Sequence, residues 1–156
     1  NDFINMILTT HALVGAAIGK NINNPLIIVP VSLASHYILD FFRHGDYLDD
    51  NSKFREVAWK VALDLSIGLI IILGYLFFSH SSFKVMTNIL IGIFFSLLPD
   101  LFTLLYWNVK IGFLKKLYDF HNWIHDYFYS ESVNWSLKNA INDILFSALA
   151  IILLFI

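Results

Sequence analysis

The sequence predicts an all-α protein, an integral membrane helical bundle of four to five transmembrane helices with one interfacial amphipathic helix. Of its 156 residues, 58% are hydrophobic and only 14% are charged, whereas an ordinary soluble domain has about 25% charged residues. The mean hydropathy is +0.67, and the apolar residues come in long runs, as in helices that lie in lipid. No repeat or charged linker divides the chain, so we expect residues 1–156 to form a single membrane-embedded domain.

Five apolar segments, taken in chain order, account for the predicted spans. The second to fifth contain 18, 19, 23 and 20 residues, close to the roughly 20 residues that cross a hydrocarbon core of about 30 Å. The first has only 14 residues, so it either begins near Phe3 and crosses or enters the bilayer partway. The segments are Met6–Gly19, Pro25–Phe42, Val61–Ser79, Val85–Trp107 and Leu137–Ile156.

The segment Phe113–Tyr129, between the fourth and fifth spans, has its apolar residues at helical spacing. This pattern predicts an amphipathic helix that lies in the membrane interface. Of the ten Lys and Arg residues, eight fall on one side of the predicted membrane, whereas Lys20 and Lys84 fall on the other. Because short loops rich in basic residues stay in the cytoplasm, we expect the loops 43–60 and 108–136 on the cytoplasmic face of a bacterial or archaeal inner membrane.

Charge and cysteine content exclude several classes of function. Ten basic residues stand against 12 acidic residues, for a formal net charge of −2, which is too even for a nucleic-acid partner. The chain has no cysteine, which excludes disulfides, thiolate zinc sites and a thiol nucleophile. Any metal ion must therefore be held by His, Asp, Glu or Asn.

Ionisable residues interrupt the apolar runs. A charged group at the bilayer centre costs at least about 2.5–3.5 kcal/mol, so such residues indicate a functional site. His36, Asp40 and His44 are four residues apart and predict one face of the second span, up to Gly45, and His121 and His125 have the same spacing. All the candidates fall toward the same predicted membrane face. The candidate metal ligands are His11, His36, Asp40, His44, Asp64, Asp100, His121 and His125.

These residues predict one composite site for divalent metal ions, one to three in number, with zinc favoured and manganese or iron as alternatives. We expect Asp40 and Asp100 to be bridging or direct ligands of two metals that activate a water molecule. Asp64 or Asp126 would orient a histidine or relay a proton. Whether Asp143 belongs to the site is left open by the sequence.

Each candidate also has a structural explanation. His11 could hydrogen-bond between packed helices, because Gly15 and Gly19 form a small-residue face that allows close approach. The His36 and Asp40 pair could form a buried neutral network, and Asp100 could cap a helix broken beside Pro99. The pair at 121 and 125 could be the polar edge of an ordinary interfacial helix.

Four short motifs in order resemble the LexA-regulated, YdjM-type family of membrane-bound metal-dependent hydrolases. They are Thr10-His11 followed by Gly15, Ser35-His36-Tyr-Ile-Leu-Asp40, Leu98-Pro99-Asp100 and His121-x-x-x-His125. The resemblance covers most of the chain. It implies a distant relation to zinc-dependent phospholipases C and single-strand-specific zinc nucleases, all-helical enzymes that hold zinc ions with His and Asp and hydrolyse phosphoesters.

The resemblance therefore implies a metal-dependent hydrolase of a lipid or other amphiphile, with membrane lipid as its partner. The last motif departs from the family, whose members carry a His-Arg pair followed by Thr-His-Ser. Here the segment 121–126 reads His-Asn-Trp-Ile-His-Asp, and an Arg that could hold a phosphate is missing. The motif also lacks the Glu after the first His that zinc peptidases use as a base.

Two other classes of function remain open from the sequence. A small proton or metal-ion transporter would use the His and Asp residues as a relay. Transport sites lie near the membrane midplane between repeats, and only a homo-oligomer could supply the second repeat here. A non-catalytic membrane subunit would use the same residues, with the Gly15 and Gly19 face, to bind a partner.

Overall fold

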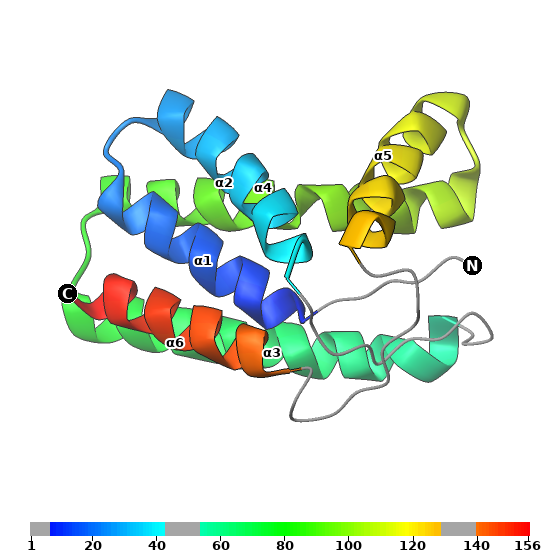
Figure 1. The fold of residues 1–156 in the computed structure, drawn as a ribbon. Coiled ribbons are helices and arrows are strands. Elements are labelled where there is room, and N and C mark those ends of the chain that lie inside the picture. The colour runs from blue at the N-terminus through cyan, green and yellow to red at the C-terminus, as the bar shows by residue number, and fades with distance from the viewer. Residues whose placement is uncertain (1–6, 43–53, 129–139) are drawn as a thin grey trace.

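The computed structural model describes residues 7–42, 54–128 and 140–156, and this part of the chain is helical, without strands (Figure 1). The all-α prediction is thereby confirmed. The segment predicted as an interfacial helix, Phe113–Tyr129, forms a helix with almost the predicted bounds. The helices are α1 (Leu8–Asn21), α2 (Pro25–Asp40), α3 (Phe54–Ser79), α4 (Phe83–Val109), α5 (Gly112–Phe128) and α6 (Ile141–Phe155).

The short helix α1 occupies the centre of the bundle. It contacts α2, α3, α4 and α6, and ten of its 14 residues are buried. Its sequence, LTTHALVGAAIGKN, is made largely of small residues, which let neighbouring backbones approach from several sides. The first predicted segment is therefore the core of the bundle, shorter than a full membrane span.

Glycines allow α1 and α4 to pack in backbone contact. A Cβ atom added at Gly15 or Gly92 would lie within 3.0 Å of the other residue's carbonyl oxygen, and one at Gly19 would meet the backbone of Asn88 equally closely. Real Cβ atoms essentially never approach so closely. The small-residue face predicted on the first segment therefore forms a helix interface, and this interface brings His11 of α1 beside Ser96 of α4.

Local sequence signals set the helix ends. Asn24 caps α2, because its side chain accepts the Leu26 N–H at 3.0 Å, and Pro25 occupies the first helical position, where no backbone donor is needed. Ser82 caps α4 by accepting the Val85 N–H at 3.4 Å. At its other end α4 closes with Lys110 in the left-handed conformation, φ 54°.

Among the residues that the structure describes, two helices are long and apolar enough to cross a membrane, Ala58–Ser79 within α3 and Phe83–Val109, which is α4. This is fewer than the four to five predicted spans. The difference arises because α2 and α6 have only 16 and 15 residues. In α2 the helix ends at Asp40, with Phe41 as its C-cap, instead of continuing through Phe42 to Gly45 as the sequence predicted.

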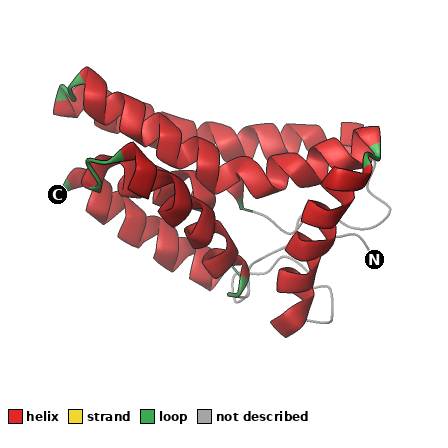
Figure 2. Ribbon diagram, turned by 90° about the horizontal axis from the view of Figure 1, so that it is seen from above, coloured by secondary structure: helices red, strands yellow, loops and turns green. Residues whose placement is uncertain are grey.

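The helices are oriented so that one end of each lies at the end of the bundle that carries α5. In Figure 1 the N-terminal ends of α1, α3 and α6 and the C-terminal ends of α2 and α4 point toward the same end of the bundle, which in Figure 2 is the end on the side of the N label. Helix α5 packs against α4 and α2 at this end. The end of the bundle that carries α5 is therefore the one where the ionisable residues of several helices meet.

Candidate metal centre

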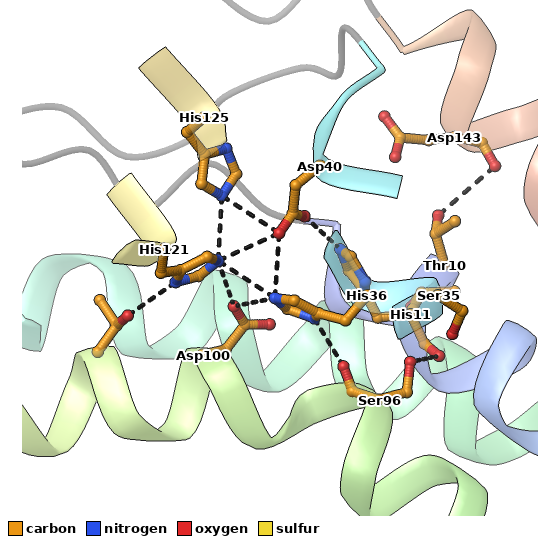
Figure 3. A network of polar contacts seen from close by, with 12 residues as sticks. Thr10, His11, Ser35, His36, Asp40, Ser96, Asp100, His121, His125 and Asp143 are labelled. Atoms are coloured by element: carbon orange, nitrogen blue, oxygen red, sulfur yellow. Dashed lines mark hydrogen bonds and ion pairs between the residues drawn. The ribbon is translucent and has the colours of Figure 1, made fainter. Parts of the chain in front are cut away.

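Six of the predicted metal ligands converge at the α5 end of the bundle (Figure 3). Their potential ligand atoms form three overlapping groups, and within each group the atoms lie within 4.8 Å of one another. Such buried groups of His and Asp could hold a metal ion. The six residues are His11 from α1, His36 and Asp40 from α2, Asp100 from α4, and His121 and His125 from α5.

Asp40 lies at the centre of the cluster, 1% exposed, and its two carboxylate oxygens face different histidines. Oδ1 lies 3.4 Å from Nε2 of His11. Oδ2 lies 3.1 Å from Nε2 of His36 and 3.2 Å from Nε2 of His121. The same oxygen lies 3.6 Å from Nε2 of His125. One carboxylate therefore contacts all four histidines.

The second carboxylate, Asp100, closes the cluster from the side of α4. Its Oδ1 lies 3.3 Å from Nε2 of His36 and 3.6 Å from Nε2 of His121. The Nε2 atoms are themselves close, 3.1 Å apart between His36 and His121 and 3.2 Å apart between His121 and His125. All four histidines therefore direct the same ring nitrogen into the space between two carboxylates.

Hydrogen bonds to Nδ1 of two of these rings determine whether the Nε2 atom of the same ring carries a hydrogen or a lone pair. Nδ1 of His36 lies 2.7 Å from the carbonyl oxygen of Ser96, to which it can only donate. The Thr103 hydroxyl donates to the Pro99 carbonyl at 3.2 Å, so its oxygen accepts from Nδ1 of His121 at 2.9 Å. With both rings neutral, the hydrogen therefore sits on Nδ1 and each Nε2 presents a lone pair.

The donor set fits a metal ion. Lone pairs of His36 and His121 face carboxylate oxygens of Asp40 and Asp100 at hydrogen-bond distance, and these four groups supply no hydrogen to share while the rings are neutral. A cation between them would be coordinated by these lone pairs and carboxylate oxygens. Metal-ligating histidines characteristically donate their other N–H to a carbonyl or similar partner, as the rings of His36 and His121 do. Imidazole and carboxylate together suit zinc, manganese or iron.

The local sequence of α4 explains part of this arrangement. Pro99 lacks an N–H, which leaves the Phe95 carbonyl, four residues earlier, without its usual helical donor. The carbonyl of the next residue, Ser96, accepts from His36, and the Ser96 hydroxyl donates to the carbonyl of His11 at 2.8 Å. Ser96 therefore ties α1 and α2 to α4 beside the cluster.

Asp64 and Asp143 lie elsewhere in the same end of the bundle. The Asp64 carboxylate accepts the Thr9 N–H at 3.3 Å and its backbone carbonyl accepts the Thr9 hydroxyl, so α3 caps the first turn of α1. The Thr10 hydroxyl shares a 2.9 Å hydrogen bond with Ser147 and donates to the Asp143 carbonyl at 3.5 Å. Neither aspartate belongs to the three ligand groups, and both residues are near the part of α1 that carries His11.

Two predicted site residues lie outside what the structure describes, namely His44 and the side chain of Asp126. The sequence analysis missed Ser96, Thr103 and Tyr37. The ring of Tyr37 lies edge-on to that of His36, with centroids 5.3 Å apart. A signal for the first two was present, since Ser96, Asp100 and Thr103 follow at helical spacing on one buried face of α4.

Comparison of the chain with protein-family models, with characterised proteins and with solved structures finds no match.

Replacing Thr103 with Val should weaken metal binding by about 10- to 100-fold, the usual cost of losing a hydrogen bond that orients a ligating histidine. Valine keeps the shape of the side chain but cannot accept from Nδ1 of His121. Metal titration of the purified metal-free protein measures the effect. Thr87→Val is the matched control, because Thr87 also bonds its own helix, to the Phe83 carbonyl at 2.9 Å, but lies in the first two turns of α4, away from the cluster. Equal affinities in the two variants would contradict the prediction.

Proposed function

We propose that this protein is an integral membrane, metal-dependent hydrolase that cleaves a phosphoester of a lipid or other amphiphile at the cytoplasmic face of the membrane. The observation that carries the proposal is the set of inward-facing Nε2 atoms around Asp40 and Asp100. The resemblance to the YdjM-type family supports the same reaction class, and zinc is the metal that it favours.

The chemistry divides between the metal and the chain. Divalent ions held by such donors lower the pKa of a bound water toward neutrality and polarise a phosphoryl oxygen. The chain supplies the neutral nitrogens and two carboxylates that bind the ions. Ser96 and Thr103 fix the orientation of two imidazole rings, and burial of Asp40 keeps bulk water from competing for its oxygens.

The surface of the helices supports a location in the membrane. Large apolar side chains are exposed along α3 and α4, among them Phe77 at 75%, Phe78 at 76% and Leu90 at 62%, an arrangement that lipid would cover. At 1.5 Å per residue α2 and α6 are about 24 and 23 Å long. These two helices would complete a bundle of four spans where the bilayer thins locally. The metal centre then lies at one end of the spans, at headgroup depth.

A proton or metal relay is the main competing function, because imidazolium rings could share protons with the same carboxylates. The packing of α1 against α4 favours a hydrolase over a relay. Toward the opposite end of the bundle, α1 and α4 are in backbone contact at Gly15 and Gly92 and again at Gly19 and Asn88. A relay across the membrane needs a continuing row of titratable groups or water, and the backbone contact leaves room for neither between α1 and α4.

The direct test is hydrolysis of a panel of lipid phosphates by the purified protein in detergent. The panel contains phosphatidic acid, phosphatidylglycerol phosphate and a polyisoprenyl phosphate, and release of phosphate or headgroup is measured. We expect release from at least one lipid, its loss on chelation and its recovery with zinc or manganese. His121→Ala should abolish release, whereas His80→Ala, at the opposite end of the bundle, should not. Metal-loaded protein that releases nothing from any lipid, yet carries protons or metal into vesicles, would establish the relay instead.

A further inference from the structure

A continuous row of aromatic side chains leads from the metal centre to the surface of α5. The Tyr37 ring lies 5.3 Å from that of His36 and 6.1 Å from that of His121, between centroids. Phe120 lies 5.3 Å from Tyr37, Trp123 stacks 6.0 Å from Phe120, and Tyr127 lies 5.6 Å from Trp123. We call Tyr37, Phe120, Trp123 and Tyr127 the aromatic row. It joins the buried ligands to the outside without a gap between rings.

The three members of the row that α5 contributes occupy one face of that helix, and its other two faces have different characters. Positions 120, 123 and 127 follow at three- and four-residue spacing and therefore form a single stripe. His121 and His125 point inward on a second face. Lys115 and Asp119 form an exposed ion pair at 2.7 Å on a third. The helix therefore presents an apolar stripe on one side of the metal centre and a charged face on the other.

The outer part of the row is exposed in the isolated chain. Phe120 is 46% exposed, Trp123 is 56% exposed and Tyr127 is 63% exposed. Contiguous exposed apolar surface of this kind marks a site of contact with lipid or another ligand. The apolar surface continues onto α2 beside Tyr37, where Ile38 is 55% exposed and Phe41 is 36% exposed. Trp and Tyr are also the residues that favour the membrane interface.

We propose that the aromatic row holds the hydrocarbon chain of the lipid phosphate substrate. The phosphate would lie at the metal centre, and the chain would leave past Tyr37 along Phe120 and Trp123. The inference rests on the proposed function for its polar end. A lipid is the occupant that the geometry favours, because the row starts against the histidines of the metal centre and runs outward as exposed aromatic surface, which suits an amphiphile whose polar end lies at the metal centre.

The test uses quenching of Trp123 fluorescence by lipids brominated in the middle of the chain. Of the four tryptophans, Trp59, Trp107 and Trp135 are replaced by Phe, and the protein is kept in detergent with zinc. We expect brominated phosphatidic acid to quench Trp123 saturably, at lower mole fraction than brominated diacylglycerol, which has the same chains without phosphate. Adding Asp40→Asn should remove this difference between the two lipids.

Two controls separate the row from the general lipid-facing surface. A variant that keeps only Trp59, which is 61% exposed on α3, should be quenched equally by both lipids. In the Trp123-only protein, Phe120→Ala should weaken saturation by about tenfold, as expected for loss of an aromatic contact. Phe77→Ala, on α3, should leave it unchanged.

Quenching does not require turnover. The lipid-binding proposal can therefore fail while hydrolysis is observed, and hydrolysis can be absent while the lipid binds. Saturable, phosphate-dependent quenching without hydrolysis would support the row as a lipid site and count against the hydrolase. Equal quenching of Trp123 by both lipids, with hydrolysis intact, would overturn the row as the seat of the substrate chain. Absence of quenching by either lipid would also overturn it.

Discussion

Asp40→Asn should reduce the metal affinity of the protein by more than about 100-fold, the upper end of what loss of a merely orienting partner costs. Asp40 is the residue whose carboxylate contacts all four histidines of the cluster, at 3.1 to 3.6 Å. Asparagine has nearly the same shape, but it removes the negative charge and turns one ligand oxygen into a donor. Elemental analysis of protein purified without added metal, followed by metal titration, measures the change.

The matched control is Asp119→Asn, which removes a carboxylate from the same end of the bundle without touching the cluster. Asp119 is exposed and pairs with Lys115 on the outer face of α5. Size-exclusion profiles in detergent should match the wild type for both variants, so that loss of metal reports the site and not unfolding. Undiminished metal content in Asp40→Asn would remove the basis of the proposed function.

Gly92→Ala should lower stability by about 1–3 kcal/mol, the usual cost of overpacking. The added Cβ atom would collide with the carbonyl of Gly15, which is backbone and cannot move aside as a side chain can. Helix α1 would have to shift away from α4, and the shift would carry His11 away from Asp40. We therefore expect a lower thermal unfolding midpoint in detergent together with weaker metal binding.

Gly74→Ala gives a control with the opposite expected sign. A Cβ atom at Gly74 on α3 meets nothing within 4 Å, and alanine stabilises a helix by roughly 0.5–1 kcal/mol relative to glycine. The midpoint of this variant should stay the same or rise. If Gly92→Ala unfolded at the same temperature as Gly74→Ala, the close α1 and α4 interface would not exist as described.

Local patterns in the sequence determined the helices and the neighbours within each helix. The long apolar runs predicted α3 and α4, and the apolar stripe of Phe113–Tyr129 predicted α5 nearly to the residue. The i, i+4 spacing placed His36 with Asp40, and His121 with His125, because one helical turn fixes which side chains share a face. Residue types alone indicated a metal site of His and Asp without cysteine.

Only the tertiary structure decided which residues from different helices meet. Asp64 lies in the N-terminal half of α3 and Asp100 in the C-terminal half of α4, so both are toward the same end of the bundle, yet Asp100 joins the histidines and Asp64 caps α1. The difference is the rotation of each helix about its axis, which is set by packing such as the Gly15 and Gly92 contact. The same packing brought Ser96 and Thr103 to the outer nitrogens of two histidines. No spacing along one helix encodes that rotation, because it depends on the side chains of every helix packed against it.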